Sequence, residues 1–329
     1  MTTRQQTRLE TDLESRRFGD IRDMLPDVDN PSPLVRVNRA LPDRDYELFL
    51  KLEWLNPFGS VKDRTAAYLL EGLARRGELE GRELVEASSG NTAIALAALA
   101  ALSGTRLTTT IPDGIPEEKK VILRMLGAEV WETPDDLCPV DNPRDGAIAL
   151  ARALAASDGG TRFAATRQYE SEDNVAAHYA TTGPEVWRQT EGRVSWFVAA
   201  YGTTGTVVGA GRFLKERDPS IQIVGVEPEP GHRLPGMKSF AEASVPGIFD
   251  PEVVDRRVIV GDSDAYRVTK DLWRKEGLMV GPSTGAVVHA VTTLPIQSGD
   301  VVVAVSADSG VKYTSYFEEI LGEEGRPRI

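Results

Sequence analysis

A lysine is predicted to stand at the first position of a helix, directly after a tight turn. Residues 56–64 have the sequence NPFGSVKDR, in which Gly59 and Ser60 favour the turn and Lys62 opens the helix. Burial and the partial positive charge of a helix N-terminus both disfavour an ammonium ion. We therefore expect the pKa of the Lys62 amine to be lowered, which makes the neutral amine available as a nucleophile. An exposed lysine beside Asp63 is the alternative that these residues also allow.

A second turn, rich in small polar residues, precedes the Ala-rich segment AIALAALAAL at residues 93–102. Backbone N–H groups at the start of such a helix can bind an anionic group such as a carboxylate, and an asparagine there could donate to a ring hydroxyl. An ordinary helix N-cap is the alternative. The residues of this turn are Ser88, Ser89, Gly90, Asn91 and Thr92.

A third turn, GTTGT, lies between a predicted strand and a predicted helix. Its hydroxyls and backbone amides suit a phosphate dianion held without arginine or lysine. A dinucleotide site is the competing interpretation because Glu227 ends the next strand, but the G-x-G-x-x-G spacing is absent. The residues of this turn are Gly202, Thr203, Thr204, Gly205 and Thr206.

A fourth turn, GPSTGA at residues 281–286, opens a helix near the C-terminus. Ser283 can donate or accept one neutral hydrogen bond there, or it can simply cap the helix. All four turns stand at strand-to-helix or loop-to-helix junctions, where open α/β sheets bind their ligands.

From Tyr46 onward, short β-rich runs alternate with longer helical segments, which is typical of parallel sheets with helical crossovers. The runs form two sets on either side of residues 134–146, which are rich in Pro and Asp and predict a loop. We therefore expect an α/β fold with two units. The predicted strands are YELFLKLE (46–53), RELVEA (82–87), TRLTTTI (105–111) and AEVWET (128–133), then SWFVAA (195–200), IQIVGVE (221–227), RRVIVG (256–261) and DVVVAVS (300–306).

The composition excludes several classes of protein. The chain has 329 residues, 41% of them hydrophobic, so it is long enough for two domains. Its net charge of -12 disfavours binding to nucleic acid. A single cysteine, Cys138, excludes an intrachain disulfide and fits a reducing compartment. Because this cysteine has no second thiol near it and the histidines have no paired ligand spacing, we expect no metal site. No apolar run is long enough for a membrane span and the first residues lack the apolar core of a signal peptide, so we expect a cytoplasmic protein.

The N-terminal segment is charged but places apolar residues at roughly helical intervals. This spacing predicts an amphipathic arm that packs on the body of the protein or on a second subunit. The residues concerned are Leu9, Leu13, Phe18, Ile21 and Leu25.

The four turns, in this order and at these intervals, resemble the cysteine synthase and cystathionine β-synthase family of fold-type II pyridoxal-phosphate enzymes. The likeness extends from about Pro31 to Tyr313. It implies a tryptophan synthase β-like fold of two three-layer α/β/α domains with mostly parallel sheets. A smaller domain, residues 55–169, would bind the substrate carboxylate, and a larger one, residues 1–54 and 170–329, would bind the cofactor phosphate. The family resemblance also implies a homodimer.

The resemblance gives each turn a role. Lys62 would carry pyridoxal 5'-phosphate as a Schiff base, with Asn91 on the ring oxygen and Ser283 at the pyridine nitrogen. The residues from Gly202 to Thr206 would bind the cofactor phosphate. The substrate carboxylate would be bound by Ser88, Ser89, Gly90, Asn91, Thr92 and Gln168.

By the same resemblance, the activity would be β-replacement: loss of the leaving group from an O-activated L-serine, and addition of a sulfur nucleophile to the resulting aminoacrylate to give L-cysteine. The turns are most similar to those of O-phosphoserine sulfhydrylases, some of which take sulfur from a thiocarboxylated carrier protein instead of sulfide. Lys238 stands where that subgroup has a phosphate-binding arginine, although it could equally be a solvated loop lysine. Synthesis of another β-substituted alanine, serine or threonine dehydration, and a nicotinamide oxidoreductase are the alternatives.

Overall fold

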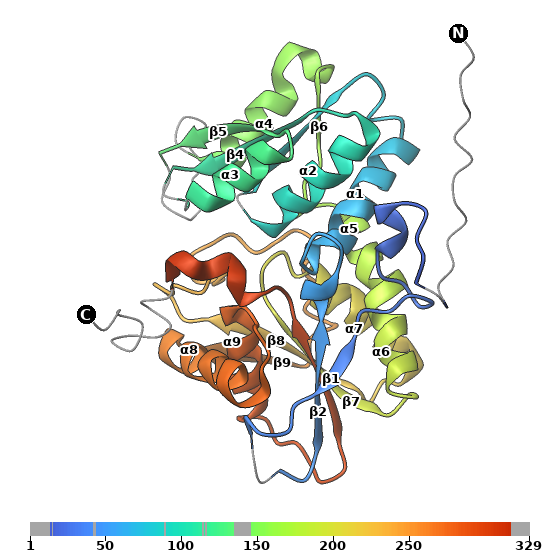
Figure 1. Cartoon of the computed structure of the whole chain (residues 1–329), viewed down its shortest axis with the longest axis vertical. Helices are drawn as coiled ribbons and strands as arrows, with labels where there is room; N and C mark the ends of the chain where they lie inside the picture. Colours follow the sequence, from blue (N-terminus) through green and yellow to red (C-terminus); the bar gives the residue numbers. More distant parts are fainter. Residues whose placement is uncertain are drawn as a thin grey trace.

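Two sheets, each with helices on both faces, make up a computed structural model of the chain, which describes residues 14, 16–41, 44–88, 90–113, 115, 117–134 and 146–316. Figure 1 shows the smaller, four-stranded sheet above the larger, six-stranded one. The expected α/β fold class is confirmed. The division at residues 54/55 and 169/170 stays a prediction.

The six-stranded sheet has the strand order β1-β2-β10-β7-β8-β9. Only β1 is antiparallel to its neighbour; the other pairings are parallel. All six residues of the central strand β10 are buried, which fits an apolar strand covered on both faces. The strands are β1 (Leu34–Arg36), β2 (Glu47–Leu52), β7 (Val194–Ala200), β8 (Gln222–Pro228), β9 (Arg256–Val260) and β10 (Val301–Ser306).

Helices cover both faces of this sheet. One face packs against α8 (Asp262–Asp271) and α9 (Pro282–Val291), through residues such as Val302 and Val287. The opposite face packs against α5 (Glu172–Ala177), α6 (Gly183–Gln189) and α7 (Gly205–Arg217), through residues such as Val303 and Val208. Two π-helical turns, His178–Thr182 and Leu272–Glu276, continue α5 and α8.

The four-stranded sheet is entirely parallel, in the order β5-β4-β3-β6. On one face Leu84 packs with α1, α2 and α3, and on the other Val85 packs with α4. These elements are α1 (Lys62–Arg75), β3 (Glu83–Ala87), α2 (Asn91–Ser103), β4 (Leu107–Pro112), α3 (Glu117–Met125), β5 (Glu129–Thr133), α4 (Ala147–Ala156) and β6 (Phe163–Ala165).

The eight predicted strands are all present, as β2, β3, β4, β5, β7, β8, β9 and β10. Two short strands, β1 and β6, were not predicted. The helical spacing of the amphipathic arm is wrong where it can be checked, because Phe18 is not helical and only Ile21–Met24 forms a short 3-10 helix. Leu25, however, packs on the body of the protein as predicted. Leu9, Leu13 and most of the predicted loop at 134–146, including Cys138, lie outside the described residues.

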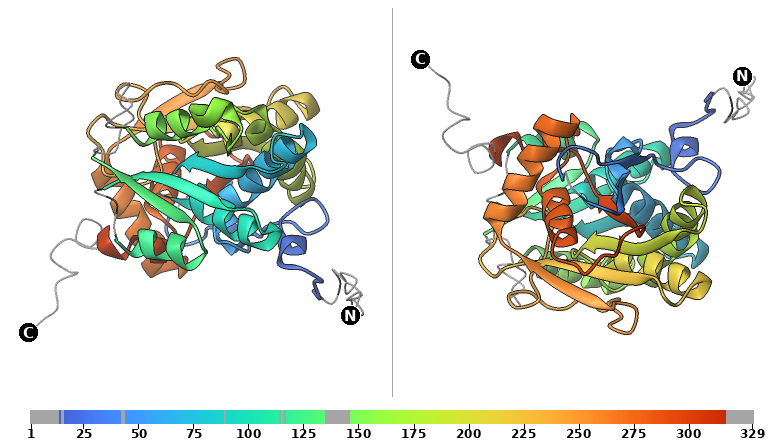
Figure 2. Two further views of the ribbon diagram at one scale, coloured as in Figure 1. Left: turned by 90° about the horizontal axis from the view of Figure 1, so that it is seen from above. Right: turned by 90° about the horizontal axis from the view of Figure 1, so that it is seen from below.

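Seen from the two ends of the molecule, the sheets lie one behind the other (Figure 2). Three short 3-10 helices at Glu53–Leu55, Ser157–Gly160 and Gly310–Tyr316 complete the secondary structure of the body. Within the described part of the chain, no helix is both long and apolar enough to cross a membrane.

Candidate active site

Helix α1 begins at Lys62, as predicted, directly after a tight turn. Gly59 has a φ of +83° and donates its N–H to the Asn56 carbonyl oxygen at 2.9 Å. Only glycine adopts this left-handed conformation without steric cost. The Val61 N–H donates to the Ala307 carbonyl oxygen at 2.8 Å, just beyond the end of β10. The lysine is therefore held at the carboxyl edge of the six-stranded sheet.

The lysine amine is more acidic than an ordinary lysine. Burial lowers the pKa of Lys62 to about 8, although the negative charges of Asp308 and Glu53 oppose this shift. About a tenth of the amine is therefore neutral at pH 7, far more than for a lysine of ordinary pKa, and the neutral amine is the form that a nucleophile or base requires.

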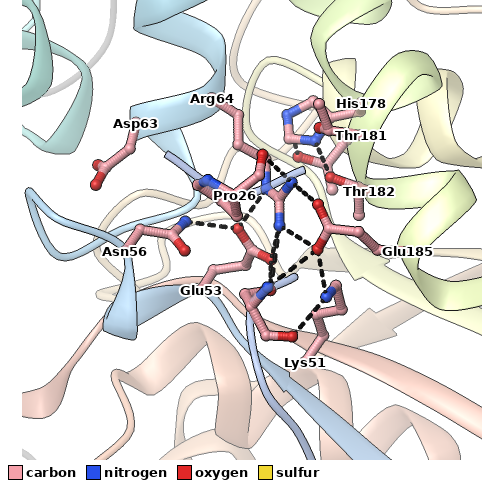
Figure 3. A network of polar contacts seen from close by, with 12 residues as sticks. Pro26, Lys51, Glu53, Asn56, Asp63, Arg64, His178, Thr181, Thr182 and Glu185 are labelled. Atoms are coloured by element: carbon pink, nitrogen blue, oxygen red, sulfur yellow. Dashed lines mark hydrogen bonds and ion pairs between the residues drawn. The ribbon is translucent and has the colours of Figure 1, made fainter. Parts of the chain in front are cut away.

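A buried ion network fixes the first turn of α1 (Figure 3). The Arg64 guanidinium binds the Glu53 carboxylate at 2.8 Å and also the carboxylate of Glu185 on α6. Glu185 in turn binds the Lys51 amine of β2 at 2.7 Å. These four side chains are fully buried and their charges sum to zero. Since Arg64 is two residues beyond Lys62, the network ties the lysine to the six-stranded unit.

A cavity of about 800 Å³ lies between the two units, and Lys62 is part of its wall. Most of the residues predicted for the site line the same cavity. Thr204 and Gly205 do not, and Ser89 lies outside the described residues. The predicted residues that line it are Lys62, Ser88, Gly90, Asn91, Thr92, Gln168, Gly202, Thr203, Thr206, Lys238 and Ser283.

The N-terminus of α2 forms one wall, with Asn91 as its first residue. The Asn91 Nδ2 donates to Asp308 Oδ2 at 2.6 Å, and its Oδ1 accepts from Lys312 Nζ at 2.8 Å. Next to it, Thr92 Oγ1 donates to Gln168 Oε1 at 2.8 Å. The fold thus brings together two predicted residues from distant segments at the positive end of a helix, where a carboxylate can bind.

The turn at residues 202–206 forms the facing wall, at the N-terminus of α7. Thr203 Oγ1 accepts from Asn174 Nδ2 at 2.9 Å, which leaves its own proton to donate. Gly205 is required by packing, because a Cβ there would lie 2.1 Å from Asn174 Oδ1. Thr206 Oγ1 lies 3.2 Å from Nε2 of the buried His178. Burial holds the pKa of His178 well below its usual value, so the ring is neutral.

Ser283, the second residue of α9, lines the same cavity. The donor set thus consists of an amine of lowered pKa, a helix N-terminus with threonine hydroxyls, and a neutral hydroxyl. A pyridoxal phosphate molecule needs a lysine amine for its aldehyde, N–H and O–H donors for its phosphate, and a partner for its ring nitrogen. The residues present therefore fit this cofactor.

Lys238 also faces the cavity, in the loop after β8. Its ammonium lies 4.0 Å from the ring centroid of Tyr169, a cation–π contact that fixes the side chain at the wall. Its backbone N–H donates to the Tyr201 carbonyl oxygen at 2.9 Å. The side chain is thus held at the cavity wall.

Two acidic residues at the site were not predicted. Asp308 is 2% exposed; its Oδ2 accepts from Asn91 and from Tyr313, whereas its buried Oδ1 has no hydrogen-bond partner among the described residues. Glu86 is 4% exposed, and its Oε1 accepts from Gln168 Nε2 at 2.6 Å. Both follow or lie in apolar parallel strands, where a carboxylate is costly to bury. A carboxylate in or directly after such a strand was the feature of the sequence that could have revealed these two residues.

The comparisons with known proteins agree with this site. Residues 26–308 match the family described as "Pyridoxal-phosphate dependent enzyme". Cysteine synthase B of Salmonella typhimurium is 40% identical over 295 residues, which cover 89% of this chain and 94% of the relative. Cysteine synthase of Aquifex aeolicus is 39% identical over 292 residues, covering 86% and 88%. This chain therefore belongs to the pyridoxal-phosphate dependent enzymes, and its cofactor is pyridoxal phosphate.

Solved structures give the same class. A cysteine synthase from Entamoeba histolytica superposes with a TM-score of 0.84 at 28% identity, covering 98% of this chain and 96% of that one. An O-ureido-L-serine synthase superposes with a TM-score of 0.84 at 29% identity, covering 94% and 98%. The fold is therefore that of the fold-type II enzymes of this family.

Proposed function

We propose that this chain is a cysteine synthase, which replaces the activated hydroxyl of an O-activated L-serine by sulfur. The observation that carries the proposal is the convergence on one cavity of Lys62, with its lowered pKa, and the helix N-terminus at Asn91 and Thr92. The names of the similar curated proteins, cysteine synthase B and cysteine synthase, support the same activity.

Pyridoxal phosphate, when bound, supplies an aldehyde carbon that a lysine amine can hold and a ring that withdraws electrons from the substrate Cα. Lys62 would hold the aldehyde, Asn91 the ring oxygen and Ser283 the ring nitrogen. The turn from Gly202 to Thr206 would bind the phosphate through the hydroxyls of Thr203 and Thr206 and through backbone N–H groups at the start of α7. Because Ser283 offers a neutral hydroxyl and no carboxylate, it would not stabilise a charged ring nitrogen.

The substrate carboxylate would bind at the N-terminus of α2, where Ser88, Gly90, Thr92 and Gln168 line the cavity. Ser89 belongs to the same proposed set. Lys62 Nζ, once freed, would take the proton from Cα, and the leaving group would depart with the electron pair of the Cβ–O bond. A sulfur nucleophile would then form the Cβ–S bond, and Lys62 would return the proton to Cα.

We propose O-phosphoserine as one substrate, with Lys238 as the cation that binds its phosphate. Lys238→Ala should lower kcat/KM for O-phosphoserine by about tenfold or more, the loss of one charge-assisted contact, and should leave O-acetylserine within about twofold. Cysteine formation with sulfide as donor measures both rates. Lys215→Ala is the control, because Lys215 pairs with Asp255 at the surface. An equal loss of kcat/KM with both substrates, or no loss with either, would contradict the assignment of Lys238 to the phosphate.

A thiocarboxylated carrier protein is the second proposed sulfur donor, and it is tested by using it in place of sulfide in the same assay.

The similarity to O-ureido-L-serine synthase favours one further candidate function, the synthesis of a different β-substituted alanine. Turnover of O-activated serine with a non-sulfur nucleophile in preference to sulfide would favour it. We also propose that the chain works as a cytoplasmic homodimer. Its mass in solution would check that it is a dimer.

A further inference from the structure

A hydrogen-bonded chain of side chains connects the proposed carboxylate site to a buried acid. Thr92 Oγ1 donates to Gln168 Oε1 at 2.8 Å, and Gln168 Nε2 donates to Glu86 Oε1 at 2.6 Å. The other oxygen of Glu86 accepts from the Thr166 hydroxyl. Thr92 and Gln168 line the cavity, whereas Glu86 lies behind them on β3 and does not.

The direction of this chain depends on the ionisation of Glu86. An ionised carboxylate can only accept, so it turns the Gln168 amide nitrogen toward itself and the amide oxygen toward Thr92. The Thr92 proton is then committed to Gln168 and points away from the cavity. In this state the threonine hydroxyl offers an approaching anion only lone pairs.

A proton on Glu86 allows the opposite direction. The acid O–H can donate to Gln168 Oε1 if the amide turns over, and Gln168 Nε2 can then donate to Thr92 Oγ1. This frees the Thr92 proton to point into the cavity. Thr166 keeps its acceptor, since the second Glu86 oxygen is unaffected. Protonation also removes a buried negative charge from behind the site.

We propose that Glu86 is a positioning residue that takes up a proton when a carboxylate binds at Thr92 and Gln168. The inference rests on the proposed function, since it assigns the substrate carboxylate to these two residues. By linkage, whatever makes the anion bind better to the protonated form makes Glu86 hold its proton more tightly in the complex. Substrate capture and proton uptake are thus one event.

The surroundings of Glu86 suit this role. Burial raises the pKa of Glu86 to about 7, against the hydrogen bonds from Thr166 and Gln168, which lower it. Tyr169 is a titratable neighbour, and burial together with the Glu86 charge raises its pKa to about 12, so it stays neutral. On the neighbouring strands β4 and β6, the residues near Glu86 are the uncharged Thr109 and Ala165. On α4, the charged Arg152 is already paired with Glu170 at the surface.

The affinity for a carboxylate should fall as the pH rises. Below about pH 7 Glu86 is protonated in both free and bound enzyme, and carboxylate affinity is at its maximum. As pH rises through this value, the free enzyme loses the proton while the complex retains it, so binding requires uptake and the affinity falls. Above the raised pKa of the complex, the affinity becomes constant again.

Propionate tests the proposal on the holoenzyme, because it has the carboxylate but no amino group to react with the cofactor. Its dissociation constant is measured by equilibrium dialysis, and its proton uptake by an indicator dye in weak buffer. We expect the wild type to lose affinity about tenfold between about pH 6 and about pH 8.5 and to take up part of a proton near pH 7.5. Glu86→Gln, a permanent neutral donor, should bind propionate at every pH with no uptake.

Glu83→Gln is the matched control, because Glu83 lies on the same strand but pairs with Arg106 and Arg162. It should behave as the wild type. If the wild type binds propionate with constant affinity and without proton uptake, the linkage to Glu86 is overturned, whereas the carboxylate site stands. Proton uptake that persists in Glu86→Gln has the same meaning. A holoenzyme that does not bind propionate at all overturns the proposed carboxylate site itself. If Glu86→Gln does not fold, the wild-type proton count still tests the linkage, because binding without uptake overturns it.

Discussion

The charges around Lys62 set the state of its amine. Burial lowers the pKa of Lys62, and Asp308 is the largest influence in the opposite direction. The sequence predicted a lysine of lowered pKa because its position after a turn and at a helix start is a local property. It did not predict Asp308, which follows β10 and meets Lys62 only when α1 docks at the edge of that strand.

The pH dependence of cofactor capture tests this balance. The neutral amine attacks the aldehyde, so after removal of pyridoxal phosphate the rate of re-incorporation should rise with pH and reach half its maximum near pH 8. Asp308→Asn removes a charge that stabilises the ammonium ion, so its midpoint should move to lower pH. Absorbance of the bound cofactor follows the rate. A midpoint near 10.5, the ordinary lysine value, or one that Asp308→Asn leaves unchanged, contradicts the assignment.

Helix α1 depends on long-range contacts as well as on its own sequence. Its start is local, set by Gly59, but its attachment is made by Arg64 through Glu53, which is 11 residues away, and Glu185, which is 121 residues away. The longer strands were predictable because β-rich runs of five to seven residues give a clear pattern. β1 and β6 were not, since each has only three residues and pairs at a sheet edge.

Arg64→Met should lower the free energy of unfolding by about 3–5 kcal/mol, because it leaves Glu53 and Glu185 buried without their main cation. Arg188→Ala, which removes a surface pair with Asp29, should cost only a small fraction of that. Denaturant unfolding measures both. Similar losses in the two variants would show that the buried network does not hold α1.

Acid should act on the same network. Burial alone would raise the pKa of Glu53, but Arg64 and Lys51 lower it to about 2. Its contribution to stability is therefore complete above its ordinary pKa of 4.5 and is lost as the pH falls through about 2. In Arg64→Met this acid dependence should be smaller, since the main cause of the lowered pKa is gone.

At the scale of the whole molecule, the cavity lies between two parallel-rich sheets. Turns that are far apart in the chain meet there because parallel strands end at the same edge of their sheet. This rule made the fold class predictable from the sequence, and with it the meeting of the four turns at one cavity. The chain from Thr92 to Glu86 was not predictable, because it depends on side-chain directions between β3 and the segment after β6.

The proposed function requires that Lys62 holds the cofactor, and the most direct test is to reduce the holoenzyme with borohydride and map its peptides. We predict a single pyridoxyl group, on the peptide that contains Lys62. Lys62→Ala should give none, while Lys312→Ala, which removes a neighbouring cavity lysine, should keep the label at Lys62. A pyridoxyl group on another lysine, or no label on the wild type, would contradict the account.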